Sequence, residues 1–220
     1  MSGALQAVFQ NQRSFIAPVP VIGSAYGGGF FAGQISTAGN GVADFNLVIG
    51  PKSSAQSTLK WSTRMSAVPG AGSVINGPQN TADIVADGNA AINPAANFCN
   101  DLVIGGFSDW YLPAKNELEV CYYNLKPTTT NNSTSSGTNT NAVPSRGSNY
   151  TTGTPARTSV TDFQTGNSEA FDSTSTNYWS STEMSNANYA WAQDFNNGYQ
   201  GNGGYKTDLN RARGIRRVAV

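Results

Sequence analysis

Histidine is missing from this 220-residue chain, and its absence removes several kinds of active site at once. A Ser-His-Asp relay, a Cys-His pair and a histidine-ligated zinc ion all need an imidazole. Cysteine is scarce as well, with only Cys99 and Cys121. Two interpretations of these thiols stay open: buried small apolar side chains, or one bridge between two packed helices. Neither provides the disulfide framework of small secreted domains.

Charge is the second scarcity. Thirteen basic and 13 acidic residues cancel, and charged residues make up only 12% of the chain, against about a quarter in an average soluble protein. A neutral chain is a poor match for nucleic acid, whose binding depends on neutralising phosphates. No apolar run approaches the roughly 20 residues of a membrane span, so we expect no membrane insertion. The opening residues also lack the pattern of a secretion signal.

Uncharged polar residues are abundant instead. Asn, Ser and Thr account for 67 of the 220 residues, there are 24 Gly, and aromatic side chains make up 10%. Aromatics at that level, with no net charge, argue against global disorder. The composition predicts a folded, turn-rich protein whose surface is better suited to binding than to catalysis.

The acidic residues are too scattered to suggest an active site. The pairs Asp83/Asp87 and Glu117/Glu119 look isolated and solvated. Four further carboxylates lack the spacing of a calcium loop, namely Asp162, Glu169, Asp172 and Asp194. We therefore expect no enzyme, no cofactor and no metal site.

Hydrophobic patterning at the front of the chain is typical of strands. Strands are expected over residues 30–35 and 45–49, joined as a hairpin across a Gly/Asn turn, with a weaker third strand over 58–63. Aromatic residues return in the last 50 positions, where a final strand is expected over 213–220 and pairs near the first. This strand-rich front and tail predict an antiparallel sheet.

Two helices are expected between these regions. One begins at Pro94 and the other at Pro113, because proline favours the first helical position. Each carries a single apolar stripe, on which Cys99 and Cys121 lie. Strands around two central helices give an α+β fold class.

The first 22 residues look separate from the body of the chain, which we take as 23–220. Prolines 18 and 20 impose an extended linker. Ahead of them, the apolar residues at helical spacing or near the linker are candidates for anchoring to another subunit or assembly: Leu5, Val8, Phe9 and Phe15. A frayed terminus, or a strand laid along the domain, is the alternative.

Residues 127–157 are a low-complexity insertion. Of these 31 residues, 25 are Asn, Ser, Thr, Gly or Pro. The segment has too little apolar surface to order itself. We expect a surface insertion that neighbouring subunits could hold in place.

Several motifs resemble one family. The run Asp109–Leu118, with sequence DWYLPAKNEL, resembles the W-x-L-P-x-x-x-E-L motif of a domain common in phage tail proteins and bacterial adhesins. The run WSSTE at 179–183 and the run RARGIRR at 211–217 resemble the C-terminal half of that family in order and spacing. The resemblance covers residues 26–220 except the insertion. Residues 3–15 also look like N-terminal segments of tailed-phage virion proteins.

The resemblance implies a C-type-lectin-like fold, related to formylglycine-generating enzymes and to receptor-binding tips diversified by retroelements. It also implies a homo-oligomer, a trimer by analogy with fibre tips. Trp179 and Trp191 fall on frame positions of the family and are expected in the core. Glu183 and the arginines of 211–217 are expected to make internal charge-assisted bonds.

The residues between the frame positions are those that the diversified relatives display. Asn and Tyr dominate them, and antibody paratopes favour the same residue types. We therefore predict a ligand-binding surface within residues 185–210, made by Asn186, Asn188, Tyr189, Gln193, Asn196, Asn197, Tyr199, Gln200, Asn202, Tyr205 and Asp208.

Two functions follow as hypotheses. In the first, the chain is a receptor-binding module of a phage tail or fibre, located on the virion. The arm contacts other virion proteins, and the Asn/Tyr surface binds a host cell-surface glycan or protein. In the second, it is a structural or decoration protein of the virion. An ordered insertion would favour the second, because only packing against neighbours is expected to order it.

Overall fold

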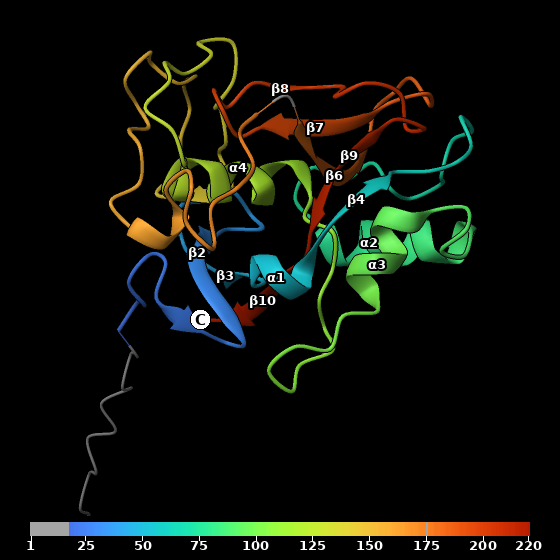
Figure 1. Cartoon of the computed structure of the whole chain (residues 1–220), viewed down its shortest axis with the longest axis horizontal. Helices are drawn as coiled ribbons and strands as arrows, with labels where there is room; N and C mark the ends of the chain where they lie inside the picture. The colour runs from blue at the N-terminus through green and yellow to red at the C-terminus, as the bar shows by residue number, and fades with distance from the viewer. Residues whose placement is uncertain (1–17, 175) are drawn as a thin grey trace, which may run out of the picture.

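The computed structural model describes residues 18–174 and 176–220 (Figure 1). The proposed anchoring residues Leu5, Val8, Phe9 and Phe15 lie outside this range. Within it the chain forms two five-stranded sheets, four α-helices and one 3-10 turn. The predicted α+β class is confirmed.

The first sheet contains the expected hairpin. Strands β2 (Gly29–Ile35) and β3 (Phe45–Ile49) pair antiparallel, with Phe30 opposite Ile49. The sheet runs in the order β1-β2-β3-β10, and β5 pairs with β2. Its other strands are β1 (Ala25–Tyr26), β5 (Ala142–Val143) and β10 (Ile215–Ala219). The prediction that the last strand lies near the first is confirmed, because β10 joins this sheet through β3.

The second sheet has the order β4-β9-β6-β7-β8. Its strands are β4 (Gln56–Lys60), β9 (Leu209–Arg213), β6 (Asn177–Glu183), β7 (Ala190–Asp194) and β8 (Gln200–Gly201). All neighbours are antiparallel except β6 and β9, which meet in parallel at Tyr178 and Arg211. The expected single strand over 213–220 is in fact the end of β9 and all of β10, which are separated at Gly214.

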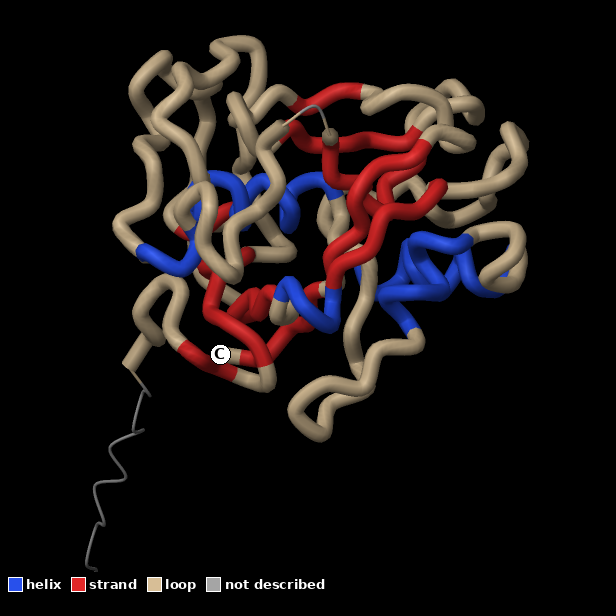
Figure 2. The backbone as a smooth tube through the Cα atoms, viewed as in Figure 1, coloured by secondary structure: helices blue, strands red, loops and turns tan. Residues whose placement is uncertain are grey.

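Gly214 is where the two sheets meet. Its N–H donates to the carbonyl of Ala55, and its own carbonyl accepts from the N–H of Gly50. A Cβ at this position would approach the Leu102 side chain to 2.6 Å, so a larger residue would have to displace that side chain. Figure 2 shows the strands of the two sheets, in red, and the helices and loops around them.

Helix α3 (Pro94–Asn100) and helix α4 (Lys115–Leu125) lie where the two helices were expected. Pro94 opens α3 as expected, whereas α4 begins at Lys115, two residues after Pro113, so that proline precedes the helix. The sequence reading missed α2 (Gly77–Asp87) and the short α1 (Lys52–Ala55). Asn76 caps α2 by accepting a hydrogen bond from the N–H of Gln79, and Pro78 lies in its first turn. The buried face of α2 includes Asn80 and Thr81, so it carries no continuous apolar stripe.

The largest core cluster lies between α4 and the first sheet and continues into an aromatic group from the C-terminal half. Phe171 and Phe195 stack at 3.8 Å between ring centroids, and Tyr178 packs edge-on against both. Trp179, fully buried, lies in a second cluster with residues of α2 and α3, as expected for a frame position. The 3-10 turn η1 (Thr161–Phe163) closes the first cluster with Phe163.

Cys99 and Cys121 are buried, unbridged and in different clusters, Cys99 in the second and Cys121 in the first. Burial raises the pKa of both thiols far above the usual value. The interpretation as small apolar side chains is confirmed. The alternative of a bridge is wrong.

The insertion differs from the prediction. The structure gives it a defined path over α4, and polar side chains take the place of an apolar core (Figure 1). Asn132 is buried and accepts hydrogen bonds from the Tyr122 hydroxyl at 2.6 Å and the Lys126 ammonium at 2.7 Å. Its amide also donates to the carbonyl of Pro155 at 2.9 Å. Low apolar content did not prevent ordering, because buried amides satisfy the polar groups of the loop.

Glu117 and Glu119 correct a second expectation. Both side chains are fully buried, and neither is solvated. Glu117 accepts hydrogen bonds from the Tyr111 hydroxyl and the Ala114 N–H, and Glu119 accepts from the Tyr150 hydroxyl. The helix spacing placed both on α4, but sequence alone did not reveal the cations and hydroxyls that face them.

Candidate functional site

The eleven predicted binding residues lie on three connections at one edge of the second sheet. These are the β6–β7 loop, the β7–β8 turn with its flanking residues, and the β8–β9 loop (Figure 1). The exposed members are Asn186, Tyr199, Asn202, Tyr205 and Asp208, and the half-buried ones are Asn188, Tyr189, Asn196, Asn197 and Gln200. We call this set, without Gln193, the Asn/Tyr surface.

Gln193 does not belong to that surface. Its side chain is 1% exposed, and its amide donates to the carbonyl of Gly198 at 2.9 Å. The residue therefore holds the two ends of the β7–β8 turn together and is not displayed. The family resemblance implies a displayed Gln193, whereas the fold encloses its side chain.

The β7–β8 turn is built from polar side chains that bond to its own backbone. Asp194 accepts from the N–H of Asn196 at 2.7 Å, and Asn197 accepts from the N–H of Tyr199 at 2.9 Å. Gly198 has a φ of +77°, and a Cβ there would approach the Tyr122 ring to 2.3 Å. This turn fixes Tyr199 at the surface, where it is 51% exposed.

The insertion supports the turn from the other side. Thr128 and Thr130 donate to the backbone and side-chain oxygens of Asn196, at 2.6 and 3.0 Å. The N–H of Ser133 donates to the carbonyl of Asn197 at 2.8 Å. Asn196 and Asn197 therefore hold the turn in place, and the insertion contributes directly to the geometry of this surface.

Tyr189 and Tyr205 form the aromatic part of the other two loops. Their rings stack with centroids 5.1 Å apart and planes inclined by 18°. Their backbones also form an isolated antiparallel bridge. Asp208 accepts from the N–H of Tyr205 at 2.8 Å. The β6–β7 and β8–β9 loops therefore meet at this pair.

A buried ion pair lies beneath the stacked tyrosines. Lys206 is fully buried, pairs with Glu183, donates to the carbonyl of Ser66 and lies 4.3 Å from the centre of the Trp61 ring. Glu183 also accepts from the N–H of Val68. The expectation that Glu183 makes internal charge-assisted bonds is confirmed.

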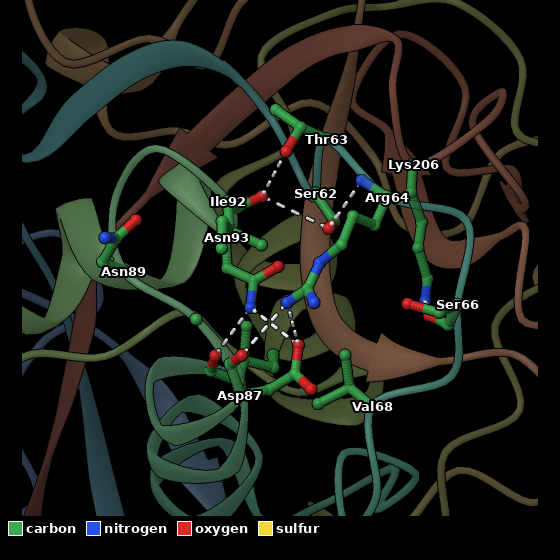
Figure 3. A network of polar contacts seen from close by, with 12 residues as sticks. Ser62, Thr63, Arg64, Ser66, Val68, Asp87, Asn89, Ile92, Asn93 and Lys206 are labelled. Carbon is green, nitrogen blue, oxygen red and sulfur yellow. Dashed lines mark hydrogen bonds and ion pairs between the residues drawn. The ribbon is translucent and has the colours of Figure 1, made fainter.

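Figure 3 shows how the loop before α2 is held against its neighbours. Lys206 points towards Ser66 of this loop. Arg64, which belongs to the same loop, points its guanidinium towards Asp87 at the end of α2. The Arg64–Asp87 distance is 2.8 Å. These two contacts join the loop to the end of α2 and to the segment that carries Tyr205.

A cleft of about 230 Å³ lies beside the Asn/Tyr surface. Trp191 from β7 and Lys115 from α4 form part of its wall, and the ammonium lies 4.7 Å from the indole centre. The remaining lining is polar and comes mostly from the insertion: Ser135, Ser136, Gly137, Thr138, Asn149 and Gln200. Trp191 is half-buried and borders this opening, so its expected place in the core is wrong.

Lys115 is the charged group of the cleft. Within the described residues its ammonium makes no ion pair, and burial lowers its pKa, an effect that the nearby Glu119 carboxylate opposes. Gln200 is oriented by hydrogen bonds to Ser136 and to the Lys115 carbonyl. The cleft therefore combines an aromatic wall, hydroxyls, amides and one cation.

The arginines of 211–217 are engaged inside the molecule. Their carboxylate partners, all between 2.6 and 2.8 Å away, are Asp172 for Arg211, Glu169 for Arg213, Asp109 for Arg216 and Glu117 for Arg217. The expected internal bonds are confirmed. In the described residues no group of three or more His, Cys, Asp or Glu is placed to hold a metal ion.

The sequence of this chain matches the family model of the Lcl C-terminal domain over residues 53–216. This chain belongs to the Lcl C-terminal domain family. The match includes helices α2 to α4, the whole second sheet and the insertion. Strands β1 to β3 precede the matched region.

Two other comparisons complete the picture. A fimbrial protein from Bacteroides ovatus is similar at 19% identity and a TM-score of 0.42, covering 77% of this chain. The alignment spans 35% of that protein's length. No curated protein matches this chain. Among the described residues, no helix has the length and apolar character needed to cross a membrane.

Sequence reasoning missed the Trp191 cleft of this Lcl C-terminal domain for a clear reason. Its walls come from β7, α4 and the insertion, which are far apart in the sequence. Gln200 was the only cleft residue among the predicted eleven. The available signal is the abundance of hydroxyl and amide side chains in the insertion, which by composition alone indicates poor packing.

Proposed function

We propose that this Lcl C-terminal domain is a surface recognition module of the adhesin type, and that it binds a cell-surface glycan. The Trp191 cleft holds one sugar residue, and the neighbouring Asn/Tyr surface contacts the rest of the ligand. No catalytic role is proposed, because the buried carboxylates are neutralised by cations and hydroxyls of the same chain.

The cleft carries this proposal. A volume of about 230 Å³ is below the usual range for drug-sized ligands and suits a single small ring. An indole provides apolar contact area, while amides, hydroxyls and an ammonium provide directional hydrogen bonds. Sugars present both kinds of surface, apolar C–H faces and hydroxyl edges.

The orientation of the domain supports the same function. The chain enters the described domain at Pro18, next to the first sheet, whereas β7 and β8 lie on the opposite side (Figure 1). A domain tethered through residues 18–22 would therefore present the cleft away from its attachment.

The narrower form of the proposal places the module on a phage tail or fibre, as a C-type-lectin-like domain in a homotrimer, with residues 1–22 contacting other virion proteins. This form depends on the sequence resemblance. An ordered insertion was expected to favour the competing hypothesis of a structural or decoration protein, on the ground that only neighbouring subunits could order it. Contacts within its own chain order the insertion, so its order does not support that hypothesis.

Replacement of Trp191 by Ala tests glycan binding. Loss of the indole wall should weaken binding to an array of purified bacterial polysaccharides by about tenfold or more, as for a central aromatic contact. Val103→Ala is the control, since Val103 is 73% exposed in the loop before α4 and does not line the cleft. Equal binding by both variants, or no binding of the unaltered domain to glycans, contradicts the proposal.

Deletion of residues 1–15 tests the virion placement separately. Particles assembled with the truncated chain should lack it, whereas the truncated domain should still bind glycans. Full incorporation of the truncated chain would remove the anchoring role without affecting the binding proposal.

A further inference from the structure

Two accessible phenols are held together on the Asn/Tyr surface. Tyr205 is 45% exposed and Tyr189 is half-buried, so both rings contact solvent. Their ring centroids are 5.1 Å apart with planes inclined by 18°, and the neighbouring Tyr205 phenol raises the pKa of Tyr189. The two phenol rings therefore face one another in a stacked pair.

The backbone enforces this approach. Besides the bridge between Tyr189 and Tyr205, the N–H of Lys206 donates to the carbonyl of Asn188 at 3.0 Å. The N–H of Met184 donates to the carbonyl of Tyr189 at 3.1 Å. The buried Lys206–Glu183 ion pair joins the same two loops. Separation of the rings would require these contacts to break together.

Other tyrosines of the described chain lack this combination. Tyr199 is 51% exposed but makes no close aromatic pair in the structure as described. Tyr122 and Tyr123 both pair with Tyr150, which is only 5% exposed. Tyr189 and Tyr205 are therefore the pair at which an external oxidant reaches both rings.

We propose that Tyr189 and Tyr205 are a site of oxidative cross-linking, at which a peroxidase with hydrogen peroxide forms a dityrosine that joins the β6–β7 and β8–β9 loops. The proposal is independent of the ligand that the domain binds. Its substrate is the chain itself, and its oxidant is of the peroxide class.

The chemistry balances without further reactants. Each phenol loses one electron and its hydroxyl proton, which gives two phenoxyl radicals. The radicals couple through their ortho carbons, and a proton then moves from each of these carbons to the oxygen of the same ring. Two electrons and two protons leave overall, and they reduce one hydrogen peroxide to two water molecules. Because both rings are at the surface, they can rotate about their side-chain bonds from the stacked to the bonded geometry.

The cross-link would close the segment 189–205 into a covalent loop. A closed loop of this kind restricts the unfolded chain and so favours the folded state, as a disulfide of similar span does. It would also fix the two loops of the Asn/Tyr surface in one arrangement. We therefore expect a higher melting temperature after oxidation.

The experiment treats the dilute, full-length chain with horseradish peroxidase and hydrogen peroxide. Digestion and mass spectrometry should show one intramolecular cross-link between the peptides that contain Tyr189 and Tyr205, lighter by two hydrogens than the separate peptides. Dityrosine fluorescence should rise in parallel. The Tyr205→Phe variant should lose both signals, since a phenylalanine ring forms no phenoxyl radical.

Tyr199→Phe is the matched control and should cross-link like the unaltered chain. A thermal melt of each variant before oxidation establishes that the fold is intact, and the Phe ring preserves the stacking. If the dominant product joins two chains through Tyr199, or if Tyr205→Phe still yields intramolecular dityrosine, the proposal is overturned.

Discussion

Arg217 donates from Nε to the Glu117 carboxylate at 2.7 Å, across 100 residues of sequence, and the carboxylate it reaches is fully buried. Glu117 also accepts from the Tyr111 hydroxyl at 2.6 Å and from the N–H of Ala114 at 2.8 Å. This cluster joins the start of α4 to β10. It places the W-x-L-P helix motif and the C-terminal arginines of the family in one structural unit.

Replacement of Arg217 by Met should lower the free energy of unfolding by about 3–5 kcal/mol, because an uncompensated buried charge remains at Glu117. Urea unfolding of the purified domain measures the change. Arg157→Met is the control, since Arg157 is exposed in the insertion. The double variant Arg217→Met/Glu117→Gln should recover part of the loss. If the single variant unfolds like the control, the pair contributes nothing to stability.

Asn132 organises the insertion, so Asn132→Ala should loosen it. The substitution leaves the buried Tyr122 hydroxyl without its acceptor and removes one acceptor of Lys126, at about 1–3 kcal/mol for each group left unsatisfied. Hydrogen exchange should accelerate over residues 127–157 and at the β7–β8 turn that they support. Asn131, exposed next to it, provides the control variant. Unchanged exchange in Asn132→Ala would mean that other contacts order the insertion.

Ligand binding should depend only weakly on salt. The Asn/Tyr surface carries a single charged residue, Asp208, and the adjoining cleft adds Lys115. Most contacts with a ligand would therefore be hydrogen bonds and aromatic contacts, which act at short range. Salt does not screen such contacts as it screens distant charges. Affinity measured at low and at physiological ionic strength should therefore differ by less than about threefold. A collapse of affinity over that range would indicate recognition through long-range attraction.

Acid should weaken the fold in part through Asp109. Its hydrogen bond with Arg216 lowers the pKa of Asp109 below the usual value. A carboxylate with a depressed folded pKa adds stability above its unfolded pKa, about 3.9, and that stability is lost as the pH falls through the folded pKa. The Asp109→Asn variant should therefore lose less free energy of unfolding between pH 5 and pH 3 than the unaltered chain. The difference should equal the contribution of the Asp109–Arg216 pair. Unfolding curves at several pH values test it, and parallel profiles for both chains would refute the assignment.

The sequence predicted those elements whose signals are local. The hairpin β2–β3 and the helices α3 and α4 follow from alternation, prolines and one apolar stripe each. Helix α2 escaped because it buries Asn80 and Thr81, which bond to distant groups such as the Leu112 carbonyl. A polar side chain looks exposed until its partner in the fold is known.

The same limit applies to the site. Composition drew attention to the loops around Tyr189, Tyr199 and Tyr205, all of which contact solvent. It could not separate Gln193, which is buried under the insertion, from Gln200, which borders a cleft. Trp191 is expected in the core because it falls on a frame position of the resembled family, but it borders the cleft. Its exposure depends on how closely residues 135–138 approach β7, and no local pattern encodes that approach.

The junction at Gly214 has a mechanical consequence. Strands β9 and β10 are one continuous stretch of backbone, and β10 is hydrogen-bonded along its length to β3. A pull applied at the cleft and resisted at residues 18–22 would pass from the second sheet to the first through this covalent segment. From β10 the force would pass through the backbone hydrogen bonds that join β10 to β3 and β3 to β2. These hydrogen bonds share the load when one strand slides along the next. If residues 18–22 tether the domain and the cleft holds a ligand, tension between them would load these two ladders of hydrogen bonds.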